Sequence, residues 1–131
     1  MERDAVIIAG FGFRSGVGLP SLRAAFALAE QGQPPVTHLA TAQDKLAALL
    51  PLAEALGLPL MGVASDALAA VSTPTRSIAS LNARHVGSVA EASALAAAGA
   101  GARLLSPRHI SPDRMATCAI AASVNLQGTP T

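Results

Sequence analysis

Short apolar segments that end at or near glycine alternate along this chain with segments whose apolar residues recur at helical spacing. Residues 5–10 (AVIIAG) are β-branched at the centre and too short for a helix, so we predict a buried strand. From Pro20 to Gly32, apolar residues recur every three or four positions, and proline and glycine mark the two ends of a predicted helix. This alternation restricts the fold strongly, because strands separated by helices form a mainly parallel sheet with helices on both faces.

The same alternation continues to the C-terminal part of the chain. The further predicted elements are a strand at residues 38–41, a helix from Leu46 to Leu56 that Pro51 should kink or split, a strand at 58–63, a short helix from Ser65 to Val71, a loop over 72–85, an alanine-rich helix opened by Gly87 and Ser88 and ended by Gly99, and strands at 102–106 and 115–124. A short polar loop joins the last two strands, which we expect to form a hairpin.

The predicted fold is therefore a three-layer α/β/α sandwich. Its sheet is mainly parallel, has about five strands and carries a C-terminal antiparallel hairpin. At 131 residues the chain has the length of one domain, which we place at residues 1–126, followed by a flexible tail over 127–131.

Composition excludes several classes of function. The chain is 51% hydrophobic and only 13% charged, which argues against disorder, and its three Phe residues without Trp or Tyr argue against a module that stacks bases. No apolar run approaches the roughly 18 residues of a membrane span, and the first residues lack the basic region of a signal peptide. We therefore expect a cytoplasmic protein that has no membrane or nucleic-acid partner.

Cysteine and histidine are too sparse for familiar metal chemistry. The single Cys118 excludes an internal disulfide and a multi-thiolate metal site, and the three His residues show no metal-ligand spacing. Cys118 lies in an apolar segment and is predicted to be an inert core thiol. We expect neither a metal nor a cofactor.

Charge is distributed unevenly although the net charge is only +1. Residues 1–70 carry a net charge of −2, whereas residues 71–114 carry +3. A modestly basic half is compatible with binding of an anionic small molecule, but its charge is too small to indicate binding of nucleic acid. The alternative is that these arginines only solvate the surface.

The first candidate site is the glycine-rich segment after the first predicted strand, read as a loop over residues 10–18. Its spacing, G-x-G-x-x-x-G, is one residue longer than the dinucleotide fingerprint, and no acidic residue closes the second strand. Exposed backbone N–H groups before a helix could still hold an anion, and Arg14 could add a bidentate contact to a carboxylate. The alternative is a tight turn with a surface arginine.

Three further groups of residues could contribute to a site. Ser88 and Glu91 open a second helix and match a capping box, which is the alternative to a binding role. Lys45, the only lysine, directly follows a predicted strand end. Arg103, Arg108, His109 and Arg114 gather around the predicted hairpin. The sequence has no nucleophile elbow and no close carboxylate pair.

The order and spacing of several segments resemble a known family. The segments are residues 10–16 (GFGFRSG), 39–45 (LATAQDK), 56–60 (LGLPL), 88–95 (SVAEASAL) after Gly87, 104–108 (LLSPR) and 115–121 (MATCAIA). Together they are similar to the cobalamin-biosynthesis family that comprises the C-terminal domain of CbiG and its stand-alone counterpart CobE. The likeness covers roughly residues 5–122, with one departure: the acidic stretch that often follows the family's lysine is replaced here by Leu-Ala-Ala.

The resemblance implies a role in making vitamin B12. It implies binding of a precorrin or corrin polycarboxylate by a carrier or accessory factor, with other corrin-pathway enzymes as further possible partners. Because the chain begins directly at the domain, the resemblance favours the stand-alone form of the aerobic pathway. The larger protein opens a lactone on a cobalt-precorrin, so a hydrolase acting on a lactone or acyl group is one alternative, and a scaffold for pathway methyltransferases is another.

We expect a crevice whose charge suits such a ligand. The predicted binding residues are Gly12, Phe13, Arg14, Ser15, Gly16, Lys45, Gly87, Ser88, Glu91 and Arg108. Phe11 and Phe13 could lie against the macrocycle or belong to the core. The candidates for a general base are Glu91, His85 and His109, none with an orienting partner evident in the sequence, so no catalytic residue is assigned.

Overall fold

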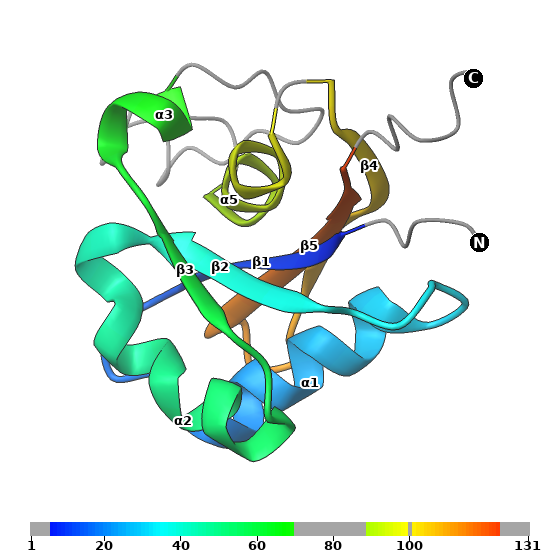
Figure 1. Ribbon diagram of the computed structural model, residues 1–131. Helices are drawn as coiled ribbons and strands as arrows, with labels where there is room; N and C mark the ends of the chain where they lie inside the picture. The colour runs from blue at the N-terminus through cyan, green and yellow to red at the C-terminus, as the bar shows by residue number, and fades with distance from the viewer. Residues whose placement is uncertain (1–5, 70–88, 100, 124–131) are drawn as a thin grey trace.

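The computed structural model describes residues 6–69, 89–99 and 101–123, which form a sheet with helices on both faces (Figure 1). The described elements are β1 (Ile7–Phe13), α1 (Leu19–Glu30), β2 (His38–Ala42), the 3₁₀ turn η1 (Gln43–Lys45), α2 (Leu46–Leu56), β3 (Leu60–Val63), α3 (Ser65–Ala69), α5 (Val89–Ala98), β4 (Arg103–Ile110) and β5 (Ala116–Ala122). Figure 1 shows α1 and α2 below the sheet and α3 and α5 above it. The predicted three-layer α/β/α sandwich is confirmed.

The strand order of the described sheet is β3-β2-β1-β5-β4. β1 pairs in parallel with β2, and β2 with β3, whereas β5 runs antiparallel to both β1 and β4. The predicted C-terminal hairpin is therefore present, with β5 inserted between β1 and β4. The carboxyl ends of β1 and β2 consequently lie side by side at one edge of the sheet.

Alternation along β1 divides the core into two layers. Ile7, Ala9 and Phe11 face α1 and α2, where the ring of Phe11 stacks on that of Phe26 at 6.3 Å between centroids. Ile8 belongs to the layer beneath α5, which alanines of α5 complete. Because successive strand residues point to opposite faces, Gly10 and Gly12 share the α5 face, while Phe13 follows Phe11 on the other.

Helix α5 lies unusually close to β1 because both surfaces are small. A Cβ atom added at Gly10 would lie 2.2 Å from the carbonyl oxygen of Ala90 and 2.5 Å from the backbone nitrogen of Ala94. A Cβ at Gly12 would lie 3.0 Å from Oγ1 of Thr117 and 3.3 Å from Cβ of Val89. These two glycines therefore provide the space that the helix occupies.

The predicted positions of α1 and α2 are confirmed, with one difference. Gly57 ends α2 in the left-handed region, at φ 68°, and its N–H bonds the last carbonyls of the helix. The helix is not split at Pro51 but runs through it. Proline removes a single backbone donor there, and burial of Leu49 and Leu52 on the sheet compensates for that loss.

Two strands extend further than the sequence predicts. β1 continues to Phe13, so the loop begins at Arg14 and not at Gly10, because Phe11 and Phe13 pair with β5. β4 reaches Ile110, so residues 107–110 are strand and not loop. Pro107 is tolerated because β4 is an edge strand and its pairing with β5 shifts register on both sides of Ser106. No described helix is long and apolar enough to span a membrane.

Candidate functional site

The described candidate site is a pocket of about 300 Å³ between the β1–α1 loop and the start of α2. It is lined by Phe13, Arg14, Ser15, Gly16, Val17, Asp44, Lys45, Ala47 and Ala48. These residues meet because β1 and β2 are adjacent parallel strands whose carboxyl ends share one edge, the usual location of ligands in α/β sheets. Five of the predicted binding residues line this pocket, with Lys45 from the second segment beside Phe13, Arg14, Ser15 and Gly16 from the first.

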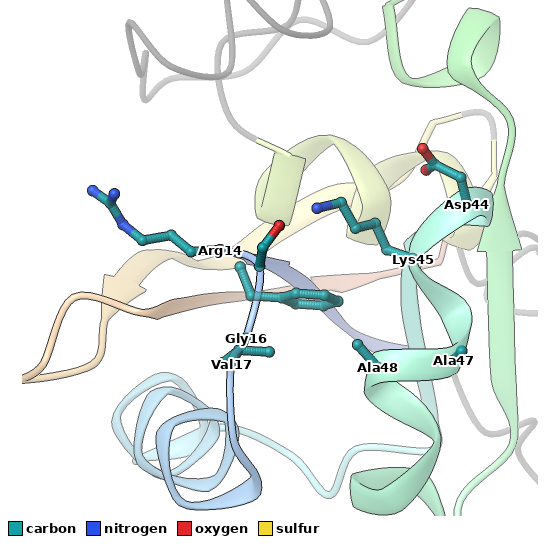
Figure 2. Close-up of a pocket in the computed structure, with 9 residues that line it drawn as sticks. Arg14, Gly16, Val17, Asp44, Lys45, Ala47 and Ala48 are labelled. Atoms are coloured by element: carbon teal, nitrogen blue, oxygen red, sulfur yellow. The ribbon is translucent and has the colours of Figure 1, made fainter.

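Lys45 and Phe13 both line this pocket and contact each other. The Nζ atom of Lys45 lies 5.7 Å from the centroid of the Phe13 ring, within cation–π range, and both side chains are half-buried. Figure 2 shows Lys45 extending from η1 toward the β1–α1 loop. Among the described residues, Lys45 makes no ion pair with a carboxylate. Its ammonium is therefore held at the pocket without being neutralised by the described part of the chain.

Arg14 lines the pocket with its stem, but its guanidinium points away from Lys45 (Figure 2). Nε of Arg14 donates to the carbonyl oxygen of Arg114 at 3.2 Å, and its backbone N–H donates to the carbonyl of Met115 at 2.9 Å. The exposed guanidinium therefore lies toward the β4–β5 turn. Lys45, and not Arg14, provides the positive charge at the pocket itself.

The loop between Arg14 and Gly18 gives the pocket an open backbone wall. The N–H of Val17 donates to the carbonyl of Arg14 at 3.2 Å, which closes a turn, and Gly16 takes φ 82°, where a side chain would be strained. Ser15 and Gly16 are exposed. Gly12, by contrast, is covered by α5 and lines no part of this pocket.

Glu91 and Arg108 come together, but away from the pocket lining. The Glu91 side chain is completely buried, and its Oε2 accepts a hydrogen bond at 2.9 Å from the backbone N–H of Arg108 in β4. This contact ties α5 to the edge strand. Gly87, Ser88 and His85 lie outside the described residues, so of the predicted capping box only Glu91 is described.

His109 does not reach the pocket either. Its Nδ1 atom lies 2.8 Å from the carbonyl oxygen of Pro107 and 3.4 Å from Oγ of Ser106. Neither His109 nor Glu91 is among the residues that line the pocket. Within the described ranges, no cluster of three or more His, Cys, Asp or Glu side chains could hold a metal ion. Cys118 is buried, and burial raises the pKa of its thiol well above the ordinary value.

A polar cluster beside the loop was not anticipated from the sequence. Asp113, in the β4–β5 turn, accepts hydrogen bonds from the hydroxyls of Ser111 and Ser21, and from the backbone N–H of Met115 at 3.1 Å. The Ser111 hydroxyl, followed by that of Ser21, lowers the pKa of Asp113. The cluster joins the turn to the first turn of α1. The only sequence signal was an Asp in a turn after Ser-Pro, which is common in loops.

Comparisons with known proteins fit this arrangement of strands and helices. The family model described as cobalamin synthesis G C-terminus matches residues 7–121. A search of curated proteins gave no match. Among solved structures, CobE, a protein from the cobalamin (vitamin B12) biosynthetic pathway, is 29% identical, with a TM-score of 0.83, over 95% of this chain and 94% of CobE.

Two further solved structures are similar. Cobalamin biosynthesis protein chiG from Agrobacterium tumefaciens str. C58 is 42% identical, with a TM-score of 0.69, over 90% of this chain and 98% of that protein. A cobalamin biosynthesis protein G homologue from Sulfolobus solfataricus is 16% identical, with a TM-score of 0.69, and the match covers 93% of this chain but 38% of that one. The last likeness shows a common fold only.

Proposed function

This chain belongs to the cobalamin synthesis G C-terminus family, and on that premise we propose that it binds a precorrin or corrin intermediate as a carrier or accessory factor. It is a protein of the cobalamin biosynthesis pathway. Such intermediates are flat, largely apolar macrocycles that carry many carboxylates. A site for them needs positive charge beside an apolar surface.

The observation that carries the proposal is the ammonium of Lys45 over the Phe13 ring, which pairs with no carboxylate of the described residues. A carboxylate that enters the pocket meets a cation that makes no ion pair with a described carboxylate, although Asp44 also lines the pocket, and the Phe13 ring beside the cation is half-buried. Arg14 adds a second, exposed positive charge outside the pocket. Charge-assisted hydrogen bonds of this kind are roughly twice as strong as neutral ones.

Binding is favoured over hydrolysis by the contents of the pocket. A hydrolase needs a general base within reach of the reacting atoms. Of the described candidates, Glu91 is engaged by the backbone of Arg108 and His109 lies by the carbonyl of Pro107, and neither lines the pocket. None of the described general bases expected from the sequence therefore lines the pocket, whose described lining holds one carboxylate, Asp44, and this lining supports recognition of an anionic ligand.

The test is a visible-absorbance titration of the protein with hydrogenobyrinic acid, a stable metal-free corrin polycarboxylate. The matched variants are Ala48→Glu and Ala55→Glu, both at exposed positions of α2. Ala48 lines the pocket, and a Glu in the first helical turn favours the helix, so this change introduces repulsion without unfolding. Ala55 is near the other end of the helix and serves as the control.

Saturable binding that Ala48→Glu weakens at least about tenfold, with Ala55→Glu close to wild type, is the expected result. The corrin recovered afterwards should have an unchanged mass. A lost fragment in the mass spectrum would instead support the hydrolase alternative. Absence of any spectral change in the wild-type protein would overturn the proposal and leave the scaffold alternative.

A further inference from the structure

The pocket is much smaller than a whole precorrin or corrin molecule. Its volume of about 300 Å³ is at the lower end for small-molecule sites and corresponds to roughly ten water-sized groups of about 30 Å³ each. A corrin with its carboxylate arms has several times that number of non-hydrogen atoms. A single pyrrole-derived ring with one propionate arm has about ten and therefore fits. The pocket can thus hold one sector of a macrocycle and not the whole ring system.

The lining matches such a sector in polarity as well as in size. One end presents the face of Phe13 with the apolar Val17 and Ala48, and the ammonium of Lys45 lies above this face. Figure 2 shows Val17 and Ala48 below Lys45, Val17 on the β1–α1 loop and Ala48 on α2. An apolar ring bearing a carboxylate is complementary to this arrangement. Asp44, which also lines the pocket, disfavours a second carboxylate beside it.

The contact between Lys45 and Phe13 can be exchanged. A cation–π contact at a partly exposed site is weak, whereas a carboxylate offers the same ammonium a charge-assisted hydrogen bond. Lysine has a flexible four-carbon stem, so a small rotation moves Nζ off the ring. That movement uncovers the Phe13 face for the incoming ring.

We propose that this pocket takes up one pyrrole-derived ring with its carboxylate arm, and that Lys45 moves from the Phe13 ring onto that carboxylate when the ligand enters. The inference rests on the proposed function, because the rest of the macrocycle must then lie outside the pocket. Arg14, whose guanidinium points outward toward the β4–β5 turn, faces the carboxylates that remain outside. Lys45 thus selects the inserted arm, and Arg14 contacts the remainder.

The experiment uses the fact that Lys45 is the only lysine in the chain. Protein labelled with isotopic lysine has one set of lysine side-chain NMR signals. In the free protein the terminal methylene should be shifted upfield by the Phe13 ring, and Phe13→Leu should abolish that shift. The probes are a pyrrole with one propionate arm, the methyl ester of the same compound, and hydrogenobyrinic acid.

The free acid should remove the upfield shift in a saturable way, whereas the methyl ester should not. Lys45→Met should weaken both the fragment and the corrin about 10- to 100-fold, with Lys45→Arg recovering part of this loss. Arg14→Ala should weaken the corrin alone. Arg23→Met removes one charge from an exposed position on α1 outside the pocket, and should change neither affinity.

Three outcomes would refute the inference, and they are distinguishable. If the corrin binds while the Lys45 signals stay unchanged and Lys45→Met retains full affinity, the inference fails and the proposed function stands. If neither the corrin nor the fragment binds, both the inference and the proposed function fail. Equal weakening of the fragment by Arg14→Ala and Lys45→Met would also contradict the assignment of Lys45 to the inserted arm.

Discussion

Replacing Gly10 by alanine tests the close approach of α5 to the sheet. The added Cβ would meet two backbone atoms of α5, the Ala90 oxygen at 2.2 Å and the Ala94 nitrogen at 2.5 Å. A carbon and a carbonyl oxygen normally approach to about 3.3 Å. The helix would therefore have to move by about 1 Å, because no flexible side-chain end can yield in its place.

The expected loss of stability follows from that displacement. A gap of about 1 Å forfeits up to half of the dispersion energy of each contact, and α5 rests on the sheet through Ala90 and Ala94, which are fully buried. Overpacking of a dense core costs about 1–3 kcal/mol, and the backbone clash places this change at the upper end. Alanine also restricts the unfolded chain more than glycine does, which raises the free energy of unfolding by about 0.5 kcal/mol. The net loss is about 2–3 kcal/mol.

Urea unfolding followed by far-ultraviolet circular dichroism measures this loss, since the chain has no Trp or Tyr for fluorescence. With a slope of about 2 kcal/mol per molar, the midpoint should fall by about 1–1.5 M. Gly18→Ala is the control, because its Cβ would meet only Pro20 Cδ at 3.5 Å, and it should change stability by less than about 1 kcal/mol. A Gly10→Ala midpoint equal to that of Gly18→Ala would refute the reasoning.

Substitutions at two other positions, Asp113 and Glu91, test polar contacts between elements. Hydrogen bonds lower the pKa of Asp113 in the folded protein, so its contribution to stability is present above about pH 4 and is lost as the pH falls through the folded pKa. In a plot of urea midpoint against pH, Asp113→Asn should therefore show a smaller fall at acid pH than the wild type. Parallel acid limbs for the two proteins would contradict this. Glu91→Ala should lower the free energy of unfolding by about 1–3 kcal/mol, because it leaves the backbone N–H of Arg108 unpaired. Glu91→Gln keeps an acceptor and should lower it less in the same urea measurement. Equal losses in the two variants would count against the contact.

The alternation of apolar segments with helical ones was sufficient to predict the sandwich and the final hairpin. Every described strand and helix overlaps a predicted one, because glycine and proline mark most boundaries. The errors occurred where pairing overrides local preference. β4 continues through Pro107 because an edge strand with shifted register tolerates a missing donor, and no local signal reports that a strand will be at an edge.

The candidate site was predictable in composition but not in arrangement. Phe13 is the last residue of β1 and Lys45 comes three residues after the end of β2, so the two lie at the same edge once β1 and β2 are known to be neighbours. The sequence alone does not show that β1 and β2 are neighbours. The direction of the Arg14 side chain depends on the carbonyl of Arg114, a hundred residues later in the chain. Such a contact has no signature in either segment alone.

The glycine-rich segment shows why one pattern can support two interpretations. Gly10 and Gly12 are two residues apart, which is the repeat of a strand, so both face α5 and give the helix room. Gly16 is four residues further on, lies in the loop, and has φ 82°. The series therefore combines two separate requirements, close helix packing and a turn. The packing glycines position α5 on one face of β1, and the same alternation directs Phe13 to the opposite face, where it meets Lys45. Gly12 therefore leaves room for α5 on one face of β1, and the next residue, Phe13, lines the pocket on the other.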